Sequence, residues 1–330
     1  MIAHVLLAAI LHVAAAAPAA SPAPVASPAP ATPPPCAGHV MAYSKPLEGV
    51  LLLHGEAAGP SRIWLWNGSA WRDLGALGVT PRSLAACAWD AKRKQLLVQG
   101  GALAIEKPGG DVDWKVDGRT LAWNGKDWRV VREGGPQPRD HHAMVFDSAR
   151  GKIVLFGGGD ADPSGRSEFF DDTWEWDGKT WTRIAATGPG PRVHHAMAYD
   201  PVRGRTVLVG GYGPDGPDGR TWEWDGKTWE NRGVSDVARR SSPRIAFDGS
   251  RNKVVLFGGQ TDASWPTDTY EWDGTRWTLV AEQGPPGRSV HALAYDEARK
   301  VVVLFGGAGP DPLGDTWELS GKVWKRVGAP

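Results

Sequence analysis

Five arginines recur at one position of a repeated pattern, and their guanidinium groups could bind carboxylates. Each stands eight residues before an Asp that follows an aromatic residue: Arg82, Arg139, Arg192, Arg240 and Arg288. Cys36 takes the equivalent place in the first copy. The planar fork of a guanidinium group suits carboxylates. Two interpretations follow: a ring that binds an acidic ligand, or a structural set paired with acids such as Asp172, Asp268 or Asp315.

Loop aromatics provide a second kind of candidate ligand-binding residue. Trp114 and Trp265 fall outside the repeated pattern and lie in segments of variable length. With Phe169 and Phe170, they could stack on a sugar ring or on a partner side chain. Loop aromatics also fold back onto their own sheet, so both interpretations stay open.

Acidic residues with alternate spacing occur in the two longest of these loops. Asp111 with Asp113, and Asp160 with Asp162, could offer carboxylate oxygens to Ca²⁺. Neither loop has the full ligand set of a calcium site. We therefore favour solvated polar loops.

A repeat of about fifty residues positions all these side chains. Each of its six copies starts with a segment that ends in an aromatic residue followed by one more residue: HVMAYS, AACAWD, HHAMVFD, HHAMAYD, PRIAFD and HALAYD. A glycine stands eleven residues after the last position of each segment. The copies close with WLWNGSAW, LAWNGKDW, WEWDGKTW (twice), YEWDGTRW and WELSGKVW. Such regularity indicates an architectural unit used several times.

Each copy predicts four antiparallel β-strands. Runs such as IVLFGG and VVVLFGG are apolar on both faces, as in a strand buried between two sheets. Asn-Gly and Asp-Gly between the tryptophan segments indicate tight hairpin turns, because both residues tolerate positive φ. The tryptophans would pack one twisted sheet on the next, each ring burying about 200 Å². The sequence therefore predicts an all-β, six-bladed β-propeller in which every blade is contiguous in the chain.

These residues resemble the kelch repeat, a family that includes the central domain of galactose oxidase. The resemblance rests on the glycine pair that ends the second strand, an aromatic on the third strand, and a tryptophan six intervening residues later, as in Trp174 and Trp181. It covers nearly the whole chain after the N-terminal segment. It implies a kelch-type propeller whose ligand-binding face is formed by the loops between second and third strands and between blades.

Four histidines share one repeat position at the start of the innermost strand: His39, His142, His195 and His291. Imidazole nitrogens bind transition metals, but equivalent positions around a propeller axis are too far apart for the short ligand distances of a metal ion. The resemblance implies that these histidines bond to the backbone. We therefore expect no metal and no other cofactor.

An enzyme remains the alternative to a binding function. The resemblance to galactose oxidase would require a copper ion held by tyrosines and histidines, with one tyrosine cross-linked to a cysteine. Four of the five tyrosines fill strand positions of the repeat, so no residue is carried over. The sequence also lacks a nucleophile elbow, a phosphate loop and an HExxH motif. We predict no catalytic residue.

The N-terminal segment indicates where the protein is located, and the charge balance limits the kinds of partner it can bind. Residues 1–20 form an apolar run that ends in small residues, which is typical of a signal peptide. No Lys or Arg precedes the run, so an uncleaved anchor stays open. Residues 21–35 are an Ala/Pro-rich linker, and residues 36–330 hold the propeller. The 37 basic and 37 acidic side chains balance, which argues against nucleic acid or an anionic membrane as partner.

The sequence thus predicts an exported, non-catalytic propeller that binds a protein or a glycan through its loop face. We expect a secreted or periplasmic monomer with no membrane span after signal cleavage. The candidate ligand-binding residues are the five arginines together with Trp114 and Trp265. The alternative is a galactose-oxidase-like or other sugar or small-molecule enzyme with its site at the channel mouth.

Overall fold

The computed structural model describes residues 32–54, 61–76, 82–106, 112–161, 167–184 and 187–328. The expected signal peptide (residues 1–20) and most of the expected linker (21–35) lie outside the described residues. Within the described ranges, no helix has the length and apolar character needed to cross a bilayer.

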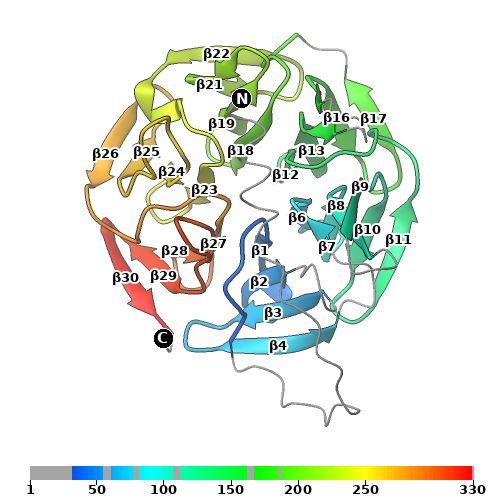
Figure 1. Ribbon diagram of the computed structural model, residues 1–330, viewed down its shortest axis with the longest axis horizontal. Coiled ribbons are helices and arrows are strands. Elements are labelled where there is room, and N and C mark those ends of the chain that lie inside the picture. Colours follow the sequence, from blue (N-terminus) through cyan, green and yellow to red (C-terminus); the bar gives the residue numbers. More distant parts are fainter. Residues whose placement is uncertain are drawn as a thin grey trace.

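Six antiparallel sheets are arranged around a common axis (Figure 1). Blade one contains β1 (Val40–Ser44), β2 (Gly49–His54), β3 (Arg62–Trp66) and β4 (Trp71–Ala76). Blade two contains β6 (Ala86–Asp90), β7 (Gln95–Gln99), β10 (Thr120–Trp123) and β11 (Trp128–Arg132). Blade three contains β12 (Ala143–Asp147), β13 (Lys152–Phe156), β16 (Thr173–Trp176) and β17 (Trp181–Ile184).

The second half of the ring repeats this plan. Blade four contains β18 (Val193–Asp200), β19 (Arg205–Gly213), β21 (Arg220–Trp224) and β22 (Trp229–Val234). Blade five contains β23 (Arg244–Asp248), β24 (Lys253–Phe257), β25 (Thr269–Trp272) and β26 (Trp277–Ala281). Blade six contains β27 (Ala292–Asp296), β28 (Val301–Phe305), β29 (Thr316–Ser320) and β30 (Val323–Val327). The predicted all-β propeller with four antiparallel strands per blade is confirmed.

Smaller elements lie outside the four-stranded sheets. Strands β5 (Arg82–Ser83), β8 (Ala102–Glu106) and β9 (Val112–Val116) form a three-stranded sheet, and β14 (Gly159–Ala161) pairs with β15 (Ser167–Phe169). Strand β20 (Gly216–Pro217) pairs with β19. Two 3₁₀ turns, η1 (Lys45–Leu47) and η2 (Asp236–Ala238), complete the described elements.

The ring closes without exchange of a strand between its ends. The innermost strands contact one another in chain order, and β1 contacts β27. Blade six is formed by β27 to β30 alone. Cys36 and His39, which precede β1 in the chain, contact blade six. The Gly307 N–H donates to the Cys36 carbonyl at 2.8 Å, and His39 Nε2 lies 2.9 Å from the Phe305 carbonyl. The prediction of contiguous blades is confirmed for the described residues.

The second strand of each blade holds the hydrophobic core together. On β13, Ile153 and Leu155 pack towards blade two, whereas Val154 and Phe156 pack towards blade four. All four side chains are fully buried. Because successive side chains of a strand point to opposite faces, one apolar strand serves two interfaces between blades. This explains why the repeat is apolar on both faces there.

The closing turns differ in detail from the expected hairpin. Trp176 pairs with Trp181, so four residues form the turn, and only the glycine, Gly178, has positive φ (102°). The Asp177 carboxylate instead accepts hydrogen bonds from the N–H groups of Lys179 and Thr180, both at 2.8 Å. The Asp therefore stabilises the turn through its side chain, and the Gly supplies the left-handed backbone.

Replacing a turn glycine by valine is expected to lower the free energy of unfolding by about 1–3 kcal/mol, because a β-branched residue is strained at positive φ. Gly125 (φ 99°) tests strain alone, since an added Cβ would meet no atom within 4 Å; Gly226 (φ 98°) adds a contact with Arg150. Gly134→Val is the control, because it has open space and no positive φ. Urea denaturation gives the three values, and equal losses at Gly125 and Gly134 would contradict the turn geometry. Gly165, in a variable loop, lies outside the described residues.

Candidate functional site

The five recurring arginines lie inside the propeller and hold its blades in shape. Each one donates from Nη1 to the carbonyl of the first glycine of its own blade's pair; in blades three and six these distances are 2.8 Å (Arg139 to Gly157) and 2.9 Å (Arg288 to Gly306). Each also forms an ion pair with an aspartate: Arg82–Asp117, Arg139–Asp172, Arg192–Asp218, Arg240–Asp268 and Arg288–Asp315.

Burial and charge favour the structural interpretation of this ring. The Arg139 and Arg288 side chains are fully buried, and Arg139 contacts Asp172 through two bonds of 2.6 and 2.9 Å. Burial alone would raise the pKa of Asp172, but the hydrogen bonds and charge of Arg139 outweigh it and hold that pKa below its usual value. The carboxylate therefore stays ionised and paired at neutral pH. The pairings expected for Asp172, Asp268 and Asp315 are confirmed.

The glycine pairs of blades two to six connect each of these blades to the next. In blades two to five, the N–H of the second glycine donates to the backbone carbonyl of the next blade's arginine, as from Gly158 to Arg192 and from Gly259 to Arg288, both at 2.9 Å. Both glycines of a pair have positive φ, and a Cβ on Gly258 would stand 2.6 Å from the Arg288 carbonyl. The pair is therefore required by backbone geometry and close approach.

The two candidate tryptophans lie apart, in blades on opposite sides of the ring (Figure 1). Trp114 lies on β9 and is 40% exposed. Trp265 is half-buried between β24 and β25, and its carbonyl approaches Gly287 so closely that a Cβ there would stand 1.9 Å away. Trp265 is thus folded onto the segment that leads into blade six, whereas Trp114 projects from the scaffold. The structure does not bring them together into one aromatic platform.

The remaining loop candidates are divided between described and undescribed residues. Asp111 and Asp162 lie outside the described residues, and Asp113 lies exposed on β9. Among the residues that the structure describes, no group of three or more His, Cys, Asp or Glu could hold a metal ion. Phe170 is buried, with the Arg139 guanidinium 4.3 Å from its ring centre. Phe170 therefore supports the arginine ring.

Two of the four equivalent histidines bond to the backbone of the preceding blade. His39 Nε2 lies 2.9 Å from the Phe305 carbonyl, and His195 Nε2 lies 3.1 Å from the Phe156 carbonyl. Burial is the main cause that lowers the pKa of each to about 3. Both rings are therefore neutral at physiological pH. His142 and His291 have buried ring nitrogens with no hydrogen-bond partner among the described residues.

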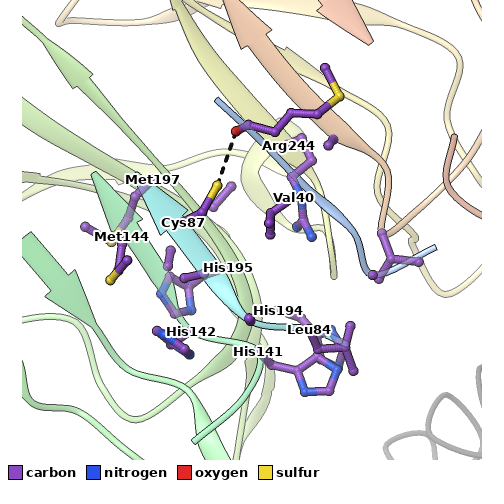
Figure 2. Close-up of a pocket in the computed structure, with 18 of the residues that line it drawn as sticks. Val40, Leu84, Cys87, His141, His142, Met144, His194, His195, Met197 and Arg244 are labelled. Atoms are coloured by element: carbon purple, nitrogen blue, oxygen red, sulfur yellow. Dashed lines mark hydrogen bonds between the residues drawn. The ribbon is translucent and has the colours of Figure 1, made fainter. Parts of the chain in front are cut away.

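A cavity of about 120 Å³ lies on the propeller axis, lined by the innermost strands (Figure 2). Six residues with positive φ form a belt, and all of them except Ser242 line the cavity: Gly38, Leu84, His141, His194, Ser242 and Val290. Within the belt, the N–H of one residue donates to the carbonyl of the preceding one in five of the six steps, at 2.8–3.1 Å. The ring centres of His141 and His194 lie 3.9 Å apart. The belt joins neighbouring blades directly around the axis.

Comparison with known proteins agrees with this architecture. Residues 83–273, more than half of the chain, match the family model described as the KLHDC2/KLHL20/DRC7 Kelch-repeats domain. The chain belongs to this kelch-repeat family. A solved structure described as "Structure of YjhT" is similar to the chain, with a TM-score of 0.71 and 15% sequence identity over 91% of this chain and 99% of that one. At that identity the likeness shows the fold alone. No curated protein matches the sequence.

Arg244 is a cavity residue of the kelch propeller that the sequence pattern alone did not single out. Arg244 lines the cavity from β23. The sequence carried a signal for it: four positions before the final Asp or Ser of the first strand, the other blades have Val40, Ala86, Ala143, Ala196 and Ala292. Blade five alone places a charged side chain there. The belt was also missed, because five of its six members are not glycine although their φ is positive.

Proposed function

We propose that this kelch propeller is an exported, non-catalytic scaffold that binds a protein or a glycan through its loop face. The observation that carries the proposal is the β8–β9 hairpin of blade two, which leaves Trp114 40% and Ile105 44% exposed. This hairpin follows the glycine pair of its blade and belongs to a sheet separate from the four-stranded one. It therefore adds two exposed apolar side chains to the loop face without serving the core. They lie on opposite faces of the hairpin, because Trp114 pairs with Ala104 and Ile105 with Asp113.

Physical chemistry supports a binding role for this surface. Exposed large apolar side chains that no core requires gain free energy when a partner removes them from water. A tryptophan ring offers a flat face for a sugar or an apolar side chain, and its N–H can still bind a polar group. The closed propeller is a rigid scaffold that holds the hairpin, and recognition loops are commonly held on such scaffolds. The apolar segment at residues 1–20 supports export.

Trp114→Ala is expected to reduce affinity for the ligand about tenfold or more, because a buried tryptophan anchor often dominates an interface. The melting temperature should change little, since Trp114 is not part of the core. A glycan array and exported proteins from the source cell, each measured with wild type and variant, provide the test. Val323→Ala is the matched control: Val323 is 70% exposed, but it lies at the β29–β30 turn, at the opposite end of its blade. Unchanged binding by Trp114→Ala would contradict the proposed face.

A second candidate function, an enzyme acting on a sugar or another small molecule, rests on a pair beside the cavity. His141 lines the cavity, and its Nδ1 lies 2.7 Å from the Asp140 carboxylate. His141 Nε2 is buried and has no hydrogen-bond partner among the described residues. A carboxylate that orients a histidine in this way favours proton transfer at the other ring nitrogen. Turnover by wild type that is lost in His141→Asn, which keeps a residue tolerant of positive φ, would favour this candidate.

A further inference from the structure

Arg244 differs from the five recurring arginines of the propeller in having no acidic partner among the described residues. Within the part of the chain that the structure describes, its one hydrogen bond runs from Nη1 to the carbonyl of the adjacent Pro243, at 3.0 Å. No carboxylate of the described residues lies within ion-pair distance of it. Arg288, in the next blade, donates to both oxygens of Asp315. The other Arg244 donors are therefore available to a molecule in the channel, and Figure 2 shows this side chain beside Val40 among the cavity residues.

The surroundings of Arg244 do not neutralise its charge. Burial lowers the pKa of Arg244 to about 10, so the guanidinium remains charged at neutral pH. The nearby histidines are neutral, because burial lowers the pKa of His195 to about 3 and that of His194 and His291 well below the usual value. A neutral imidazole supplies no negative charge. The channel thus holds a cation whose desolvation is offset by no anion of the described chain.

The side chains at the level of Arg244 favour one kind of anion. At the level of Arg244, the other five blades contribute four alanines and Val40. These small apolar side chains suit an alkyl group and offer nothing to a strongly hydrated, tetrahedral dianion. A carboxylate is planar and matches the guanidinium fork in two parallel hydrogen bonds. The cavity of about 120 Å³ has room for a small molecule only.

We propose that the central channel binds a small monocarboxylate, with the carboxylate on Arg244 and the alkyl part against the alanine walls of the neighbouring blades. This site is separate from the loop face, and its ligand need not be the partner recognised by Trp114. Five copies of the repeat place an apolar side chain at this position, and the copy in blade five places arginine there. A single cationic position in an otherwise apolar ring gives one binding orientation.

Titration calorimetry on the full-length protein tests the site, with acetate, propionate and butyrate as probes and with sulfate and phosphate at matched ionic strength. We expect saturable binding of the monocarboxylates at one site per chain, and a loss of affinity of about tenfold or more in Arg244→Ala. Arg220→Ala is the matched control, because the Arg220 side chain is 51% exposed. Equal affinity of wild type and Arg244→Ala, or saturable binding of sulfate and phosphate alone, would overturn the proposal.

Stability provides a second readout that does not depend on the probe. Alanine is the residue that four other blades have at this position, so Arg244→Ala should fold. Without ligand, its melting temperature should be equal to or above that of wild type, because the variant removes a buried charge that has no partner. Butyrate should raise the melting temperature of wild type and leave that of Arg244→Ala unchanged. A marked loss of stability in the ligand-free variant would show that Arg244 is structural and would reject the site. Trp114→Ala should bind the carboxylates as wild type does, which separates this test from that of the loop face.

Discussion

Arg288→Ala is expected to lower the free energy of unfolding by about 3–5 kcal/mol, the cost of breaking a buried ion pair on one side. Arg288 is fully buried and donates to Asp315 at 2.6 and 3.0 Å and to the Gly306 carbonyl at 2.9 Å. Alanine makes none of these hydrogen bonds, so Asp315 keeps a buried charge without a cationic partner. The Gly306 carbonyl also loses a donor at the point where blade six meets the start of blade one.

Urea denaturation followed by tryptophan fluorescence measures this loss. Arg192→Ala and Arg220→Ala form a matched pair, because both arginines contact the same oxygen of Asp218, at 2.6 and 3.1 Å, yet their side chains are 3% and 51% exposed. Arg220→Ala, at the exposed position, should lower the free energy of unfolding by less than about 1 kcal/mol. Arg192→Ala, at the buried position, should lower it several times more. If Arg192→Ala and Arg288→Ala instead kept the melting temperature and lost affinity for an acidic ligand, the arginines would form a ligand-binding ring.

Trp229→Ala is expected to lower the free energy of unfolding by about 3–5 kcal/mol, as for other large aromatic side chains removed from a core. Trp229 is 7% exposed, and its ring centre lies 5.3 Å from that of Phe156 in blade three and 5.4 Å from that of Trp224 in its own blade. Its indole N–H donates to Thr173 Oγ1 of blade three at 2.9 Å. One side chain thus joins two blades by both apolar contact and a hydrogen bond.

Two further variants separate these contributions in the same denaturation experiment. Trp229→Phe keeps most of the apolar contact but leaves Thr173 without its donor, so it should cost about 1–3 kcal/mol. Trp114→Ala, at an exposed tryptophan, should stay within about 0.5 kcal/mol of wild type. A loss in Trp229→Ala no larger than that in Trp114→Ala would contradict the assignment of Trp229 to the interface between blades three and four.

The repeat determined the strands and turns of this protein from local chemistry alone. A run such as Ile153 to Phe156 is apolar on both faces, and only a strand between two packed sheets buries both faces at once. Gly178 marks its turn because positive φ is accessible to glycine almost without cost. These features depend on a few neighbouring residues, so the order of strands and the contiguity of the blades could be predicted from spacing.

The role of the arginines could be predicted only in part from the sequence. Asp172 and Asp315 were recognised as possible partners of Arg139 and Arg288 from the order of the strands. Whether those guanidinium groups face solvent or the interior depends on how closely neighbouring blades pack. The structure buries them, and this burial favours the interpretation in which their donors serve the fold.

Only the tertiary structure decided what surrounds the axis. The backbone of His141 and His194 adopts positive φ because each residue bonds to its neighbour in the adjacent blade, a contact made only once the ring has closed. Arg244 could be seen in the sequence as an exception among alanines, but not as a charge without a partner. That property depends on which side chains of all six blades meet at the axis, and residues so far apart in the chain are brought together by closure of the ring rather than by any local pattern.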